Sequence, residues 1–209
     1  MNYEGPEPTG LIFAGGRGVR FSGLKQLVGL EGKPILQHVI DTVSELDWKF
    51  SPILVLGYRK DRIIDSLDPK GIRIVENDKF EKGLSTSMKR GIKACSPGTG
   101  GYLFFLGDMP LISPDNVRAV LAEARSGASL AATCFGNKRG FPVYLHRKWK
   151  EDLLEVTGDR GARGIIKGNR EELSVVDTAN RGVIMDIDER NDLKRVEAYI
   201  NKEGSEVGV

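Results

Sequence analysis

The sequence has few of the residues on which several classes of protein depend. Its two cysteines, Cys95 and Cys134, are too few and too isolated for a disulfide framework or a zinc site, so we interpret both as reduced thiols. It has no apolar run long enough to cross a bilayer and no signal-peptide pattern, which predicts a cytoplasmic protein without a membrane partner. A formal net charge of +2 gives no broad electrostatic surface for nucleic acid.

Histidine is equally scarce, which weakens the case for a hydrolase. His38 falls in a predicted helix and His146 at the end of a predicted strand, and neither has an evident serine–acid partnership. Residues 83–87, GLSTS, are not the nucleophile elbow GxSxG, because the last position is Ser87.

The sequence does contain alternating apolar runs and amphipathic segments. This alternation predicts an α/β domain with a parallel sheet covered on both faces, and shorter strands after about residue 130 predict a mixed edge. Ser113 is expected to cap a helix that begins at Pro114. The predicted strands are 10–14, 52–56, 72–75, 102–106, 130–134, 141–145, 173–176 and 183–187; the predicted helices are 34–46, 61–67, 85–94, 114–125, 147–154, 161–167 and 189–201.

The stretch 11–34 carries the densest functional pattern. Its predicted strand runs into AGGRGVR, residues 14–20, and Lys25 follows. Glycines let the backbone approach a ligand and turn several N–H groups towards one point, and neighbouring cations favour phosphate. The P-loop does not fit, because Leu24 separates Gly23 from the lysine, and the dinucleotide motif GxGxxG would need glycine at Phe21. We therefore predict another kind of phosphate-binding loop; the alternative is an ordinary loop with solvated charges.

Acidic residues follow two other predicted strands. Asp108 comes just after 102–106, and ligands of open α/β sheets bind beyond the carboxyl ends of the strands. A carboxylate there suits Mg²⁺ near phosphates, although a turn aspartate that caps its own backbone is the alternative. Asp186 and Asp188 alternate and therefore face one side of an extended segment. Asp186 is the better candidate for a second metal contact, since capping of the closing helix is equally plausible for Asp188.

Polar residues also precede the predicted helix 85–94. Asn77 can offer its amide to the edge of a base. At least one of Ser85, Thr86 and Ser87 is expected to cap the helix.

In this order the motifs resemble the nucleotidyltransferases that act on molybdenum cofactor, most closely the cytidylyltransferases, with the guanylyltransferases as relatives. The resemblance covers about residues 11–200 and is carried by FAGGRGVRFSGLKQL, GKP, GLSTSMKRG, LGDMP, RGFPV, GDRGAR and DIDERNDL. GDRGAR (158–163) and RGFPV favour the cytidylyl branch, whereas the pair Gly15-Gly16 is more like the guanylyl branch. CTP is the predicted donor, and GTP stays open as the alternative.

The resemblance implies a single Rossmann-like three-layer α/β/α domain with a mostly parallel, partly mixed sheet, of the nucleotide-diphospho-sugar transferase type. This NTP transferase domain would occupy residues 10–209 after a polar tail at 1–9. A nucleotide-binding part would span about 10–125, and an acceptor-binding part about 126–190.

The implied reaction moves an NMP from an NTP to a phosphate-bearing acceptor, expected to be molybdenum cofactor, with Mg²⁺ or Mn²⁺ and release of pyrophosphate. A molybdoenzyme or its chaperone is a candidate partner that receives the product. The attacking phosphate is already ionised at pH 7, so the shortage of histidine is no obstacle.

The resemblance also implies roles for individual residues. The catalytic residues would be Arg20, Lys25 and Asp108; the nucleotide-binding residues Ala14, Gly15, Gly16, Arg17, Gly18, Lys25, Asn77 and Ser85; the acceptor-binding residues Gly140, Pro142, Gly158, Asp159 and Gly161; and the metal ligands Asp108, Asp186 and Asp188. Two rivals remain open: a nucleotidyltransferase for a sugar phosphate or another small phosphate, and a regulatory module that binds NTP without releasing pyrophosphate.

Overall fold

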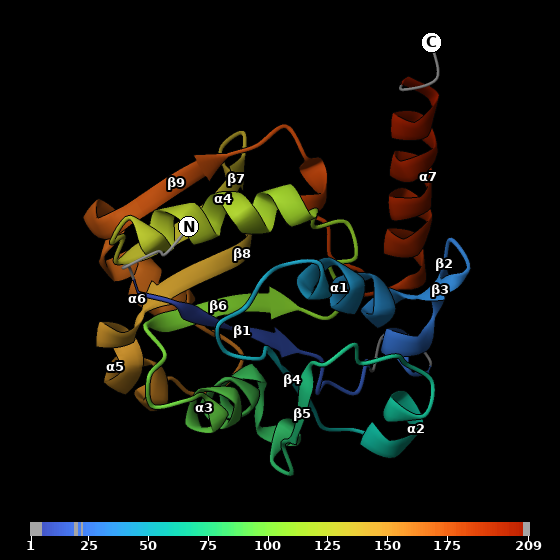
Figure 1. The fold of residues 1–209 in the computed structure, drawn as a ribbon. Helices are drawn as coiled ribbons and strands as arrows, with labels where there is room; N and C mark the ends of the chain where they lie inside the picture. Colours follow the sequence, from blue (N-terminus) through green and yellow to red (C-terminus); the bar gives the residue numbers. More distant parts are fainter. Residues whose placement is uncertain (1–5, 19–20, 22, 207–209) are drawn as a thin grey trace.

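The computed structural model describes residues 6–18, 21 and 23–206 (Figure 1). The strands are β1 (Pro8–Phe13), β2 (Gly29–Leu30), β3 (Lys33–Pro34), β4 (Ile53–Leu56), β5 (Arg73–Glu76), β6 (Gly101–Leu106), β7 (Leu130–Phe135), β8 (Lys138–His146) and β9 (Leu173–Asp177). The helices are α1 (Ile35–Ser44), α2 (Lys60–Ile64), α3 (Leu84–Ala94), α4 (Pro114–Arg125), α5 (Lys150–Glu155), α6 (Arg163–Gly168) and α7 (Arg190–Glu206).

A seven-stranded sheet with the order β5-β4-β1-β6-β8-β7-β9 forms the centre of the molecule. β5, β4, β1 and β6 are parallel, and β7 is parallel to β9. The prediction of an α/β fold with a mostly parallel, partly mixed sheet is confirmed. The antiparallel strand lies inside the sheet rather than at the predicted edge, because β8 pairs with both β6 and β7. The short β7–β8 connection allows only an antiparallel pair.

Helices cover both faces of the sheet, as Figure 1 shows. Ile12 and Phe105 belong to the core beneath α1 and α4, whereas the neighbouring residues Leu11 and Phe104 belong to the core beneath α3, α5 and α6. Burial on both faces explains why the central strands are continuous apolar runs rather than alternating ones.

Residues 183–187 were predicted as a strand, and this prediction is wrong. The structure has a 3₁₀ helix at Arg181–Ile184 and then an extended segment outside the sheet. The expected alternation survives, since Met185 and Ile187 are buried whereas Asp186 is exposed. The backbone N–H of Ile187 donates to the carbonyl of Asp108 at 3.0 Å. Periodicity predicts an extended backbone, but pairing also requires a free strand edge, and β8 and β7 already occupy that side of β6.

Helix starts show one confirmed and one wrong prediction. Ser113 caps α4 in a capping box with Asn116, as expected. No serine or threonine caps α3, because the position before the helix is Gly83. The N–H of Leu84 instead donates to Asp159 Oδ1 at 3.0 Å. The cap therefore comes from the loop that contains GDRGAR.

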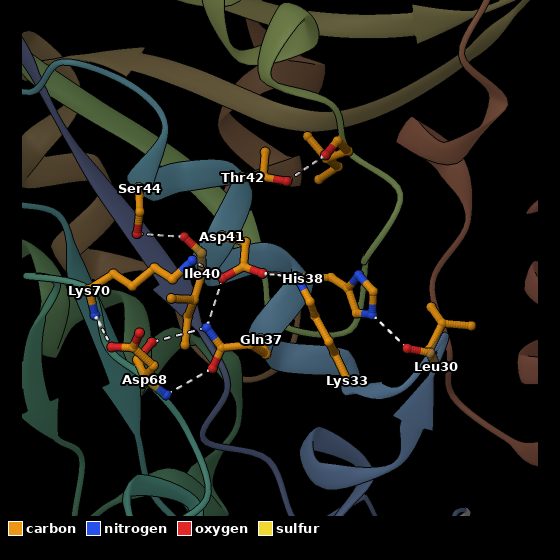
Figure 2. Close-up of polar contacts among 11 residues, drawn as sticks. Leu30, Lys33, Gln37, His38, Ile40, Asp41, Thr42, Ser44, Asp68 and Lys70 are labelled. Atoms are coloured by element: carbon orange, nitrogen blue, oxygen red, sulfur yellow. Dashed lines mark hydrogen bonds and ion pairs between the residues drawn. The ribbon is translucent and has the colours of Figure 1, made fainter.

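A polar cluster fixes α1 against the segment that precedes β5 (Figure 2). Asp41 accepts hydrogen bonds from Lys33 Nζ at 2.7 Å, Lys70 Nζ at 2.8 Å and Gln37 Nε2 at 2.9 Å. Burial raises the pKa of Asp41, but these donors outweigh burial and hold the pKa well below its usual range. The amide of Gln37 also bonds to the backbone of Asp68 in both directions.

The first and last elements of the fold are β1 and α7. β1 begins at Pro8, so the last two residues of the predicted tail are buried in the sheet. α7 packs Val196 against Phe21 and Ile35 and extends away from the body at its C-terminal end (Figure 1). Within the described part of the chain, none of the helices combines the length and the hydropathy needed to span a membrane.

Candidate active site

The loops after β1 and β6 meet at the same end of the sheet, as the sequence predicts. The two strands pair in parallel, with Phe13 opposite Leu106. Gly107 comes so close to β1 that a Cβ there would lie 2.7 Å from the Cβ of Ala14. The glycine loop and Asp108 are therefore neighbours, at the edge where open α/β sheets bind ligands.

Lys25 connects the acidic residues of this site. Its Nζ donates to Asp108 Oδ2 at 2.6 Å and to Asp188 Oδ1 at 2.9 Å. Burial lowers the pKa of Lys25, but the two carboxylates outweigh burial and raise the pKa above its usual value. Burial also raises the pKa of Asp108, against the opposing effect of Lys25. Three residues far apart in sequence thus form one charged cluster.

The predicted metal ligands lie around this cluster. Among the described residues, no group of three histidine, cysteine or acidic side chains is close enough to hold a metal as the side chains stand. Lys25 is the cation that Asp108 and Asp188 share. Asp108 Oδ1, however, is buried without a hydrogen-bond partner in the described structure. A buried carboxylate oxygen with a free lone pair is a donor that fits a hard divalent cation.

The sequence left open whether Asp188 caps the closing helix, α7. The backbone N–H groups of Asp188 and Glu189 both donate to Asp192 Oδ2, at 3.1 and 3.0 Å. Asp192 thus accepts from the two residues that precede α7, while the carboxylate of Asp188 binds Lys25.

A residue that sequence reasoning missed shapes the glycine loop. The buried side chain of Gln26 donates from Nε2 to the carbonyls of Ala14 and Gly16, both at 2.9 Å. These bonds satisfy two carbonyls of the loop and tie the loop to the segment that carries Lys25. Gly18 has φ +59°, and a Cβ there would lie 3.1 Å from Lys25 Cβ, so glycine is required next to the lysine.

Arg17 belongs to this loop, and its side chain already has partners. Its guanidinium lies 5.5 Å from the ring centre of Tyr58 and 5.7 Å from that of Phe80, and it pairs with Glu81. Arg20, the other predicted arginine, lies outside the described residues.

Two cavities open at this end of the sheet. We call the first, of about 470 Å³, the glycine-loop cavity. The second, of about 540 Å³, is the arginine-rim cavity. They share a wall that includes Leu106, Asp159 and Asp186. Their other principal lining residues are Gly15, Gly16, Gly18, Lys25, Phe80, Ser87, Asp108 and Asp188 in the first, and Met88, Phe104, Met109, Lys138, Arg139, Gly140, Phe141, Arg160, Gly161 and Arg163 in the second.

The structure places Asn77 and Ser85 outside both cavities. The Asn77 amide donates to Thr86 Oγ1 at 2.9 Å and to Ser87 Oγ at 3.0 Å, so it orders the start of α3. Ser85 is buried, and its backbone N–H donates to the carbonyl of Gly158 at 3.0 Å. Ser87, rather than Ser85, lines the glycine-loop cavity. The predicted contacts of Asn77 and Ser85 with nucleotide stay predictions.

The predicted acceptor residues lie on or beside the arginine-rim cavity. Gly140, Asp159 and Gly161 line it. Gly140 also allows β8 to pass Val183, since a Cβ there would lie 2.1 Å from the Val183 carbonyl oxygen. Pro142 is buried outside the lining, because it alternates with Phe141 and faces the other side of β8.

The arginines of the arginine-rim cavity lie in two of the motifs that carry the resemblance. Arg139 begins the RGFPV motif, and Arg160 and Arg163 belong to GDRGAR. Both motifs carry the family resemblance, which by itself implied no role for these arginines. Gln26 gave no such signal, because nothing local indicates where its amide points.

A doubly wound sheet with a glycine loop, a buried lysine and carboxylates at its strand ends defines an α/β protein whose candidate ligand site lies at those ends. Within that class the chain belongs to the MobA-like NTP transferase domain family, whose model matches residues 10–175. The resemblance inferred from the motifs is thereby confirmed.

Curated relatives agree with this family. The bifunctional protein GlmU of Solibacter usitatus is 32% identical over 184 residues, which cover 85% of this chain and 38% of that protein. A probable molybdenum cofactor guanylyltransferase of Thermococcus sibiricus is 29% identical over 148 residues, 70% of this chain and 71% of that protein. The chain thus spans between about a quarter and little more than a third of the GlmU proteins that it matches.

Solved structures have the same fold. An Rv0371c homologue from Mycobacterium sp. strain JC1 has a TM-score of 0.83 and 27% identity, covering 93% of this chain and 96% of that one. Rv0371c of Mycobacterium tuberculosis, solved in complex with manganese, has a TM-score of 0.79 and 21% identity, with 92% and 98% covered.

Proposed function

We propose that this protein is a nucleotidyltransferase that moves an NMP from an NTP to a phosphate-bearing acceptor and releases pyrophosphate. The observation that carries the proposal is the junction of the two cavities at Asp186, beside the cluster of Lys25 and Asp108. One cavity has the glycines and the lysine that suit a triphosphate, and the other is larger and is lined in part by Met88, Phe104 and Phe141. A transfer reaction needs two substrates to meet at one point, and the shared wall provides that point.

The chemical step requires alignment more than acid–base catalysis. An oxygen of the acceptor phosphate attacks the α-phosphorus of the NTP and forms a new P–O bond. The bond from the α-phosphorus to the oxygen bridging to the β-phosphate breaks, and pyrophosphate leaves with that electron pair. Lys25 would neutralise the triphosphate, and backbone N–H groups at 15–18 would orient it. Arg20 is proposed to add to this neutralisation.

Asp108, Asp186 and Asp188 are the residues proposed to hold a divalent cation, Mg²⁺ or Mn²⁺. When bound, the cation would supply positive charge to the phosphate oxygens. The unpartnered Oδ1 of Asp108 supports this role, and so does the manganese complex of Rv0371c, a protein with the same fold.

CTP is the proposed donor and molybdenum cofactor the proposed acceptor, and the product would pass to a molybdoenzyme or its chaperone in the cytoplasm. The GDRGAR and RGFPV motifs support the cytidylyl branch. GTP is the second candidate donor, because a curated relative is a probable molybdenum cofactor guanylyltransferase.

The decisive experiment measures pyrophosphate release with CTP, GTP, ATP and UTP, each with no acceptor, with molybdenum cofactor and with a sugar phosphate. We expect release with CTP that depends on the cofactor. Release with GTP instead would assign the guanylyl branch, and release only with a sugar phosphate would replace the acceptor. Binding of NTP without release for any acceptor would favour a regulatory module and overturn the proposal.

A further inference from the structure

The backbone of the glycine loop is held in place through its carbonyl groups. Gln26 Nε2 donates to the carbonyl oxygens of Ala14 and Gly16, both at 2.9 Å. The carbonyl between them, that of Gly15, accepts from the backbone N–H of Tyr58 at 3.2 Å. All three carbonyls therefore have donors, and two of the three depend on one side chain.

The N–H groups of the same loop are in the opposite situation. Among the described residues, the backbone N–H groups of Gly15, Gly16 and Arg17 donate to no acceptor. In a trans peptide the C=O and the N–H point in opposite directions. The bond from Gln26 to the Ala14 carbonyl therefore sets the direction of the Gly15 N–H. Its bond to the Gly16 carbonyl sets the direction of the Arg17 N–H in the same way.

Gln26 does not itself reach the glycine-loop cavity. Gly15, Gly16 and Lys25 line that cavity, whereas Gln26 lies outside the lining and is only 4% exposed. It follows Lys25 in a 3₁₀ helix that ends at Leu27. Any effect of Gln26 on an anion in the cavity must therefore pass through the loop backbone and the placement of the lysine.

The oxygen of the same amide has no partner. Within the described structure, Gln26 Oε1 is buried and accepts no hydrogen bond. A buried acceptor without a partner destabilises a fold, and an apolar side chain of the same length would avoid that loss. The glutamine is therefore better explained by what its nitrogen does to the loop than by its effect on stability.

We propose that Gln26 is a positioning residue for the NTP: its amide holds the glycine loop in the one backbone orientation that presents successive N–H groups to a polyphosphate. This inference deepens the proposed function and rests on it for the identity of the ligand as a nucleoside triphosphate. Gln26 contacts no reacting atom and takes part in no chemical step, so its effect is measured on binding.

The test is isothermal titration calorimetry of inorganic tripolyphosphate with the purified full chain, in Mg²⁺ buffer without acceptor. Gln26→Met removes the donor and adds no charge, and Gln26→Glu removes it in a side chain of the same shape. Both variants should bind tripolyphosphate about tenfold more weakly than the parent, or worse. In the transfer reaction both should raise the KM for the NTP about fivefold or more and change the KM for the acceptor less than about twofold.

Gln37→Met is the matched control. Gln37 is also a buried glutamine, 8% exposed, and its Nε2 donates to Asp41 Oδ1 at 2.9 Å and to the carbonyl of Asp68 at 3.0 Å. It lines neither of the two cavities. Its loss should lower the stability of the fold and leave tripolyphosphate binding as in the parent.

Each other outcome overturns the inference. If the folded Gln26 variants bind tripolyphosphate as the parent does, or if the parent does not bind it, Gln26 does not position a polyphosphate. If one variant does not fold, the other decides; if neither folds, Gln26 is a structural residue only. Failure of the parent to release pyrophosphate with any acceptor would overturn the proposed function and leave the binding comparison unaffected, so the two proposals fail separately.

Discussion

At the scale of single residues, the candidate site depends on how one lysine is shared. Lys25 bonds both Asp108 and Asp188, and its side chain is only 12% exposed. A buried ammonium between two carboxylates offsets part of their negative charge in the absence of substrate. A triphosphate would add negative charge there, and Lys25 and a cation held by the aspartates are the groups that would offset it.

Asp108→Asn tests the role of the buried carboxylate. The amide is similar in size and leaves Lys25 paired with Asp188, so the fold should persist. We expect pyrophosphate release to fall by about 100-fold or more, because the carboxylate proposed to hold the divalent cation beside the phosphates is lost. Asp115→Asn on α4, whose side chain is 89% exposed, is the control. Release at the parent rate with Mg²⁺ would remove Asp108 from the catalytic residues.

At the scale of elements, the 158–163 loop and α3 depend on each other. Asp159 accepts from the N–H of Leu84, and Gly158 accepts from the N–H of Ser85. A Cβ at Gly83 would lie 2.6 Å from Asp159 Oδ1, so glycine is needed where the two segments touch. The start of α3 therefore holds the loop that lines the arginine-rim cavity.

A pair of substitutions at Asp159 separates capping from charge. Asp159→Ala removes the acceptor and should lower the free energy of unfolding by about 0.5–2 kcal/mol, whereas Asp159→Asn keeps a capping oxygen and should cost less. Urea denaturation of both variants measures the difference. Equal losses for alanine and asparagine would mean that the hydrogen bond to Leu84 does not stabilise the fold.

At the scale of the whole molecule, Asp41 links stability to pH, because its cluster joins α1 to the segment before β5 (Figure 2). The pKa of this carboxyl is lower in the folded state than in the unfolded chain, where it is about 3.9. Its contribution is therefore complete above the unfolded-state pKa and is lost as the pH falls from about 5 towards the folded-state pKa.

The variant Asp41→Asn tests this linkage. The parent should be more stable than Asp41→Asn at pH 6, and the gap should shrink as the pH falls towards 2. Salt should reduce the gap at pH 6, because the side chains of Lys33 and Lys70 are 56% and 42% exposed. Thermal unfolding across this pH range, with Asp152→Asn on the exposed face of α5 as control, measures the effect. A gap that is constant with pH would contradict the assignment.

By itself the sequence determined the fold class, most element positions and the end of the sheet where the site lies. Continuous apolar runs such as 102–106 predicted buried parallel strands, and residues that directly follow a strand must lie at its carboxyl end. These are local consequences of backbone periodicity, so the glycine loop and Asp108 could be placed without coordinates.

Only the tertiary structure decided which of these residues touch. The bond from Lys25 to Asp188 joins positions 163 residues apart, and the cap from Asp159 to Leu84 joins positions 75 apart. Local patterns also did not predict that β8 lies inside the sheet. Nor did they predict that the segment 185–188 lies outside it. Such contacts depend on how whole elements pack, and packing is a property of the assembled core that no spacing along the chain encodes.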